Sequence, residues 1–439
     1  MHSTRSPLPA ELSAAAPSGA TRSAAPSSGV VIATVAGNAL EFYDFVTYAF
    51  FAVYIGKAFF PASTPLGSLL LSVAVFGVGF VSRPLGGIVI GHFADRAGRR
   101  PAMLLTIALI TVGTAVLALT PPYSRIGIVA PLIVVAARLV QGLALGGEVG
   151  PATAFLIEIA PSHRRGFSAS WQLASQGTAT LAAGILGVSL TATLTPAQLE
   201  SWGWRVPFGL GLLLVPIAVY LRRHLPETLH GGRTPAHQSG LRGVRLHRRI
   251  LGLSILLILG GTVSTYVGNF MTTFAIATLK MPPLAAMTAT VVGGAATFSC
   301  SLLGGWLSDR FGRRPTMLWP RILLALTCVP AFHALIAHPT PAMLCSVTLL
   351  QTALTALSAS ASIVAIPEFL PRGFRATGLS LAYAAAVTVF GGTTQFIVTW
   401  LIEVTGNPAA PAWYVAGTSV LCAGAMMRVP ETLGRPLED

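Results

Sequence analysis

Long apolar runs recur along the whole chain, and the short stretches between them carry most of its charged residues. Each run holds about 20 residues or more, which is enough for a helix to cross roughly 30 Å of hydrocarbon. Because backbone N–H and C=O groups that face lipid must be paired within their own segment, such runs are helical. The pattern predicts twelve spans, at about 28–57, 66–93, 101–119, 126–157, 166–193, 204–223, 250–279, 284–307, 315–337, 341–367, 376–403 and 410–428.

The composition agrees with this interpretation. Of the 439 residues, 53% are hydrophobic and 10% are charged, whereas a soluble domain averages about 25% charged residues. We therefore expect a polytopic α-helical membrane protein whose surroundings are a lipid bilayer.

The net charge of +14 raises the question of a nucleic-acid partner, and the placement of the cations argues against one. Cytoplasmic loops of membrane proteins carry an excess of Lys and Arg, so we expect a bacterial inner-membrane protein with both termini in the cytoplasm. Most of the 28 basic residues then lie on the cytoplasmic side; the exceptions are Lys57, Arg125, Arg205 and Lys280 at the outer face and Arg83, Arg138 and Arg321 within spans.

The segments outside the spans carry no predicted site. Residues 1–27 are rich in Ser, Ala and Pro and are expected to be a disordered cytoplasmic N-terminus rather than a signal peptide. Residues 224–248 form an Arg-rich cytoplasmic linker whose histidines lack metal-ligand spacing, and 429–439 form a cytoplasmic C-terminus. The four cysteines lie in apolar spans, so we expect no metal ion and no cofactor.

Three motifs occur twice, in the same order, about half the chain apart. They are GHFADRAGRRPAM (91–103) with GWLSDRFGRRPTM (305–317), IEIAPSHRRG (157–166) with PEFLPRGFRATG (367–378), and RRHLPETLHG (222–231) with MRVPETLGRP (427–436). Repeats of this kind mark many transporters. We predict two pseudo-symmetric six-helix bundles, at 28–223 and 249–428.

Two copies of G-x-x-x-D-R-x-G-R-R, each after the second span of a half, resemble the signature of the major facilitator superfamily. The resemblance covers about residues 28–432 and implies loops that join helix ends at the cytoplasmic face and take part in gating. The charges fit this role, because a carboxylate near a helix N-terminus is stabilised by the helix dipole. The expected gating residues are Asp95, Arg96, Arg99, Arg100, Asp309, Arg310, Arg313 and Arg314, together with the pairs Glu158–Arg165 and Glu368–Arg375.

Charged and polar residues within the spans indicate a pathway, because an ionised side chain in lipid costs about 2.5–3.5 kcal/mol. Glu41, Asp44 and Glu148 are the candidate proton carriers, and Arg83 and Arg138 the candidate anion ligands. Arg321 is expected at the cytoplasmic interface. Polar residues at helical spacing on the first, fifth and seventh spans complete the expected substrate site: Asn38, Tyr48, Gln172, Gln176, Tyr266 and Asn269.

Further stretches resemble the metabolite–proton symporter family of that superfamily, and most of all its citrate and tricarballylate symporters. They are GNALEFYDF (37–45), SRPLGG (82–87), RLVQG (138–142), SWQLASQ (170–176), WGWRVPF (202–208) and FGGTTQF (390–396). The resemblance implies import of a small organic acid with protons, by a protein that we expect to be a monomer and not an enzyme.

The residues favour the same function independently. Arginine holds a carboxylate through two parallel hydrogen bonds, and moving a dianion into a negative-inside cell costs about 4.6 kcal/mol at 100 mV, so protons must accompany it. No G-x-x-x-x-G-K-[ST] motif is present to bind ATP. Three alternatives remain open at this point: uptake of a zwitterion such as proline or betaine, efflux by antiport, and a membrane sensor that binds but does not transport.

Overall fold

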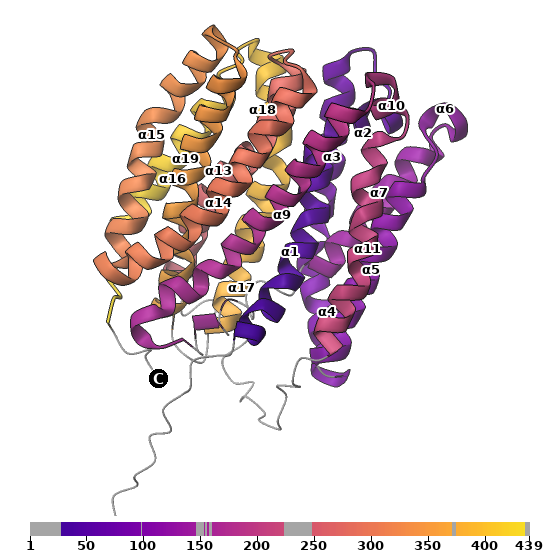
Figure 1. Cartoon of the computed structure of the whole chain (residues 1–439). Coiled ribbons are helices and arrows are strands. Elements are labelled where there is room, and N and C mark those ends of the chain that lie inside the picture. Colours follow the sequence, from indigo (N-terminus) through magenta and orange to yellow (C-terminus); the bar gives the residue numbers. More distant parts are fainter. Residues whose placement is uncertain are drawn as a thin grey trace, which may run out of the picture.

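The computed structural model describes residues 28–97, 99–145, 160–223, 248–370 and 375–434, together with Thr153, Leu156 and Ile157. These residues form helices joined by short loops (Figure 1). The first half contains α1 (Ser28–Phe50), α2 (Ala52–Phe59), α3 (Pro65–Val81), α4 (Arg83–Ala97), α5 (Arg99–Leu119), α6 (Tyr123–Ile126), α7 (Val129–Leu145), α9 (Arg165–Thr193), α10 (Pro196–Ser201) and α11 (Val206–Arg223). The second half contains α13 (Arg248–Ala277), α14 (Pro283–Phe311), α15 (Arg313–Ala337), α16 (Pro341–Phe369), α17 (Arg375–Ala386), the π-helical turn Val387–Gly391, α18 (Gly392–Thr405) and α19 (Ala410–Met426).

Each of the twelve predicted spans contains one of these helices or a pair of consecutive ones. Seven helices of the described residues are individually long and apolar enough to cross a membrane, among them α9, α13, α14, α15 and α16. The predicted N-terminus 1–27 lies outside the described residues, as do the linker 224–248 apart from Arg248 and the last residues of the C-terminus, 435–439.

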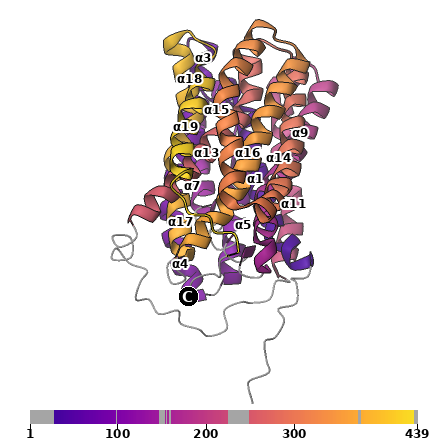
Figure 2. The same ribbon diagram turned by 90° about the vertical axis from the view of Figure 1, so that its left-hand side faces the viewer.

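The helices form two bundles that lie side by side (Figure 1). Figure 2 shows the same molecule from the second half, with α15, α16 and α19 in front. The main contacts between the bundles are α9 on α14, α3 on α18, α9 on α16 and α1 on α13. Sites between the halves are therefore lined by these helices.

Glycines allow α9 and α14 to approach closely along their whole length. A Cβ added at Gly177 would overlap the backbone of Phe298, and one added at Gly294 would overlap the backbone of Leu181. Small residues at helix interfaces have this function in membranes, where the backbones themselves come into contact.

Two helix irregularities face each other near the centre of the molecule. The second span breaks at Ser82, whose hydroxyl donates to the carbonyl of Leu139 on α7 at 2.9 Å, and α4 begins at Arg83. The eleventh span contains the π-helical turn, whose Gly391 lies against Phe80 and Tyr266. Helix breaks and π-turns of this kind are frequent at functional sites.

We predict that Gly294→Ala destabilises the protein by about 1–3 kcal/mol, because the added methyl group overpacks the α9–α14 interface. The measurement is the melting temperature of the purified protein in detergent. Gly417→Ala on α19 is the matched control, since a Cβ there meets no atom within 4 Å. Equal melting temperatures for the two variants would contradict the close packing described above.

Candidate functional site

A buried ion pair joins three helices of the first half. Asp44 on α1 and Arg138 on α7 are 8% and 3% exposed, and Asp44 Oδ2 lies 3.7 Å from Arg138 Nη1. Thr114 on α5 donates to Asp44 Oδ1 at 2.7 Å, and Gln141 donates to Oδ2 at 2.8 Å. Arg138 in turn donates to Gln141 Oε1 at 2.7 Å. The carboxylate thus has three partners, which offset the cost of its burial.

Arg138 is less well satisfied than Asp44. Its guanidinium carbon lies 3.7 Å from the centre of the Tyr48 ring, and its Nε and Nη2 have no hydrogen-bond partner among the described residues. Tyr48 is fully buried and donates to the carbonyl of Ser72 at 3.1 Å. Tyr48, which the sequence predicted as a substrate ligand, is therefore placed to hold Arg138 with its ring.

Arg83 lies in an aromatic cluster between the halves. Its guanidinium carbon is 4.0 Å from the centre of the Phe80 ring and 5.3 Å from that of Phe45. The Phe80 and Tyr266 rings pack edge to face, with centres 5.6 Å apart. Tyr266 and Tyr383 lie within electrostatic reach of the guanidinium, and its Nε has no partner in the described part of the chain. Both arginines thus retain hydrogen-bonding capacity for an anion.

A polar cavity of about 40 Å³ lies between the halves. Two predicted ligands, Gln176 on α9 and Asn269 on α13, line it, and Asn269 Nδ2 has no partner among the described residues. Other polar lining residues are Thr180, Ser264, Thr265, Thr297, Ser301, Thr352 and Thr355.

Two other predicted ligands, Asn38 and Gln172, do not line this cavity. Asn38 Nδ2 donates to Ser175 Oγ at 2.7 Å and to the carbonyl of Gln172 at 3.2 Å, which fastens α1 to α9. The side chain of Gln172 is 1% exposed, and neither of its polar atoms has a hydrogen-bond partner in the part that the structure describes.

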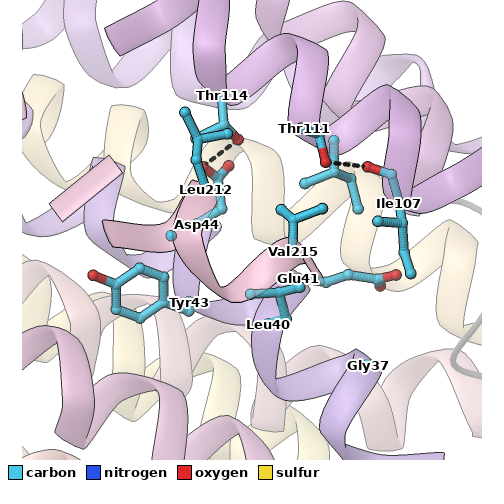
Figure 3. Close-up of a pocket in the computed structure, with 12 residues that line it drawn as sticks. Gly37, Leu40, Glu41, Tyr43, Asp44, Ile107, Thr111, Thr114, Leu212 and Val215 are labelled. Atoms are coloured by element: carbon cyan, nitrogen blue, oxygen red, sulfur yellow. Dashed lines mark hydrogen bonds between the residues drawn. The ribbon is translucent and has the colours of Figure 1, made fainter. Parts of the chain in front are cut away.

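The carboxylates of α1 open to a second, smaller cavity of about 20 Å³ inside the first half (Figure 3). Glu41 and Asp44 lie one turn apart, and both line this cavity with Thr111 and Thr114 of α5 and Val215 of α11. The neighbouring Phe42 lines the central cavity. The two predicted proton carriers thus share one chamber, separate from the one that Gln176 and Asn269 line.

The second copy of the repeated motif forms a contact between the halves. Asp309 at the end of α14 accepts hydrogen bonds from the backbone N–H groups of Gly166 and Phe167, both at 2.8 Å, in the first turn of α9. Arg313 is fully buried, donates to Asp309 at 2.7 Å, and forms a two-pronged pair with Glu368 of α16 at 2.9 and 3.0 Å. Asp309 is thus an anion at a helix N-terminus, as expected, and the helix that it caps is α9 of the opposite half. We call Asp309, Arg313 and Glu368 the clasp.

Residues after α19 extend the clasp. Glu431 accepts from the backbone N–H groups of Arg313 at 2.8 Å and Arg314 at 3.0 Å, and Thr432 Oγ1 donates to Glu368 at 2.6 Å. Burial alone would raise the pKa of Glu431, but the N–H donors outweigh it and hold the pKa below its ordinary value. Glu431 is therefore a carboxylate at neutral pH, and it caps α15.

The other predicted gating residues have different outcomes. Arg310, expected in an inter-helix pair, instead lies over the rings of Trp306 and Phe311 on its own helix. Glu368 pairs with Arg313, and Arg165 begins α9. Glu148 and Glu158 lie outside the described residues, as do the side chains of Asp95, Arg96, Arg99, Arg100 and Arg375.

Arg321 is not at the cytoplasmic interface, contrary to expectation. Its side chain is 0% exposed and lies inside the second half, where its Nη1 donates to the carbonyl of Gly260 and to Ser264 Oγ, both at 2.9 Å. The prediction was wrong because the glycine and serine acceptors come from α13, which the position of Arg321 in the sequence does not reveal.

Sequence reasoning also missed Thr114, Gln141 and Tyr383. Gln141 follows Arg138 by three residues, so helical spacing could have found it as a neighbour on the same face. Thr114 and Tyr383 lie in spans with several other polar residues, and only the packing of their helices identifies their partners.

Two family models match the chain. One, described as Sugar (and other) transporter, matches residues 29–242, and the other, described as Major Facilitator Superfamily, matches residues 253–437. Among curated relatives, a citrate-proton symporter of Klebsiella pneumoniae is 36% identical over 397 residues, 89% of each chain. An alpha-ketoglutarate permease of Escherichia coli K12 is 34% identical over 89% of this chain and 91% of its own. A putative proline/betaine transporter of Staphylococcus haemolyticus is 31% identical over 89% of this chain and 85% of its own.

Solved structures agree on the fold. The xylose transporter XylE from E. coli, in a partially occluded inward open conformation, superposes with a TM-score of 0.71 at 18% identity, over 93% of this chain and 99% of that one. With two matching family models, relatives above 30% identity and this two-bundle architecture, the chain belongs to the major facilitator superfamily, a class of membrane transporters rather than enzymes.

Proposed function

We propose that this protein takes up a small di- or tricarboxylate, such as citrate or tricarballylate, together with protons, by alternating access in the bacterial inner membrane. The observation that carries the proposal is the buried Asp44–Arg138 pair, in which two nitrogens of the cation have no hydrogen-bond partner among the described residues. The citrate-proton symporters among the relatives support the substrate class.

The cations provide the substrate ligands in this proposal. Arg83 and Arg138 each have at least one nitrogen without a hydrogen-bond partner in the described part of the chain, and a carboxylate is the anion that fits a guanidinium in two-pronged fashion. Gln176, Tyr266 and Asn269 offer neutral polar groups to the hydroxyl and remaining carboxyl oxygens. Asn38 and Gln172 support the site from α1 and α9.

Asp44 is the proposed coupling group. When Asp44 takes a proton it loses its negative charge, and Arg138 loses the counter-ion at 3.7 Å while keeping its bond to Gln141. The freed positive charge then attracts a substrate carboxylate. Because binding free energies are reciprocal, the bound carboxylate also favours the protonated form of Asp44.

A dianion needs at least two accompanying protons to enter without net charge. Glu41 shares the cavity of Asp44 and is the proposed second carrier, with Glu148 as a further candidate. Entry without protons would cost about 4.6 kcal/mol at 100 mV.

The clasp is the proposed gate. Asp309 joins the second half to α9 at one end of the molecule, and Thr273 donates to the carbonyl of Ala49 at 3.0 Å, joining α13 to α1 at the other. When the halves rock about the central site, opening one end breaks the contact at that end while the contact at the other end is kept. In the first half, Asp95, Arg96, Arg99 and Arg100 are proposed to act in the same way, with Glu158 and Arg165.

We predict that proteoliposomes containing the protein accumulate labelled citrate when the interior is alkaline. Arg138→Gln should lower accumulation at least about tenfold, because a charged hydrogen-bonded contact is worth about 1.5–3 kcal/mol. Arg125→Gln, an exposed arginine of α6 in the same half, is the control. Accumulation of proline or betaine in place of citrate would favour the zwitterion alternative, and binding without accumulation would favour a sensor.

Asp44→Asn should abolish accumulation driven by a pH gradient, because the amide is neutral and takes up no proton. Counterflow exchange of citrate, which needs no net proton movement, should continue at a measurable rate. Glu200→Gln, whose carboxylate pairs with Lys57 at the surface, is the control. If the Asp44→Asn protein still concentrates citrate in proportion to the pH gradient, Asp44 is not the carrier.

Asp309→Ala should open the cytoplasmic end, because loss of a helix cap costs about 0.5–2 kcal/mol, a two- to thirtyfold shift in population. The probe is the rate at which a cysteine at the buried position Ser170, which lies against Gly305, is alkylated. Arg310→Gln, one residue away, serves as the control. Identical alkylation rates would remove Asp309 from the gate.

A further inference from the structure

Arg321 is a cation buried within the membrane-spanning part of α15, and its partners are neutral. Besides the carbonyl of Gly260 and the hydroxyl of Ser264, it donates from Nε to Ser358 Oγ at 3.3 Å. No ion pair joins it to any carboxylate of the described residues. Charged residues inside membrane proteins normally pair with one another or mark a substrate pathway, because burying an uncompensated charge is costly. The counter-charge of Arg321 is therefore missing from the described protein.

One guanidinium nitrogen of Arg321, Nη2, lies beside small residues of α13 and α16. Nη2 has no hydrogen-bond partner among the described residues, and it lies 3.9 Å from the place that a Cβ would occupy on Gly261. That same place is 3.8 Å from the Cβ of Ala359. Gly261 and Ala359 are both half-buried. Two of the smallest residues therefore lie between Nη2 and the space beyond them.

The space beyond Ala359 is the central cavity between the halves. Ser264 and Ala359 both line it, together with Asn269 and Thr355. The hydroxyl of Ser264 thus belongs to the cavity lining and also accepts a hydrogen bond from Arg321. Since the lining side chains are neutral, the guanidinium behind them gives the cavity its positive potential on this side.

We infer that Arg321 binds one carboxylate of an anionic substrate in the central cavity, through Nη2 beside Gly261 and through the hydroxyl of Ser264. The inference rests on the proposed carboxylate transport and adds a ligand from the second half. Arg83 and Arg138 belong to the first half and are not among the residues that line this cavity, so a substrate with two or more carboxylates is held by both halves only when the halves close on it. A monocarboxylate can be held by only one of them. Arg321 thereby selects for polycarboxylates and links their binding to closure of the two halves.

The experiment compares citrate and acetate binding to the purified full-length protein by titration calorimetry. Gly261→Ala places a methyl group over Nη2 while leaving every hydrogen bond of Arg321 in place, and it should raise the Kd for citrate about tenfold. Gly252→Ala, on the same helix where a Cβ meets no atom within 4 Å, should leave the Kd unchanged. Arg321→Gln should raise the Kd for citrate at least as much, and in that background Gly261→Ala should have no further effect. Acetate binding should change much less than citrate binding in these variants, because the arginines of the first half can still hold a single carboxylate.

Each outcome decides a separate question. An unchanged citrate Kd in Gly261→Ala and in a folded Arg321→Gln overturns the role of Arg321 and leaves the proposed function intact. Should Arg321→Gln fail to fold, Gly261→Ala alone decides, because its effect does not depend on removing the cation. A lower melting temperature with unchanged citrate affinity assigns Arg321 a structural role and overturns the inference. If the wild-type protein binds no carboxylate at all, the proposed function and this inference fail together.

Discussion

The structure depends on the pairing of two buried charges, those of Asp44 and Arg138. Asp44 and Arg138 lie where lipid and protein exclude water, and each would be costly there without the other. Thr114 and Gln141 complete the shell of the carboxylate, so α1, α5 and α7 are held at one point. In the proposed mechanism, the carboxylate that holds these helices together is also the group that takes up the proton. Stability and transport would then depend on one contact.

Asymmetry between the halves follows from where the charges are placed. The described part of the first half holds Glu41, Asp44, Arg83 and Arg138 within its helices, whereas the second half holds Arg321 among neutral acceptors. A substrate with negative charge is the natural complement of both arrangements. The two bundles share a fold and a repeated motif, but they contribute different chemistry to the space between them.

Much of the fold could be predicted from the sequence, because a run of apolar residues long enough to cross a bilayer has only the helix available to it. The predicted spans agree with the described helices to within a few residues at most ends, as at 166–193 and α9. The fourth span is the exception, since α7 ends at Leu145 and most of the residues that follow it lie outside the description. The break at Ser82 is signalled by Pro84, which has no backbone N–H to donate and restricts the residue before it. The π-helical turn at Val387–Gly391 could not be predicted, because it lies against residues of other helices.

The candidate site was less predictable. Helical spacing correctly placed Glu41 and Asp44 near one another, but it did not reveal that they open to a cavity within the first half. Asn38, predicted on the same face, instead bonds to α9. The location of Arg321 could not be read from its own span, because the atoms that receive its hydrogen bonds lie about 60 residues earlier and 37 residues later in the chain. Spacing along one helix defines a face of that helix, and the neighbour on that face is decided by packing.

The bond between Asp309 and α9 has a consequence for variation among proteins of this kind. Its partners are main-chain N–H groups, and position 167 contributes only its amide to the contact. Any amino acid except proline supplies that amide, so the residue at position 167 can vary without loss of this hydrogen bond between the halves. This contact therefore depends on two positions: the acid at Asp309, and Gly166, where a Cβ would overlap the Asp309 carboxylate.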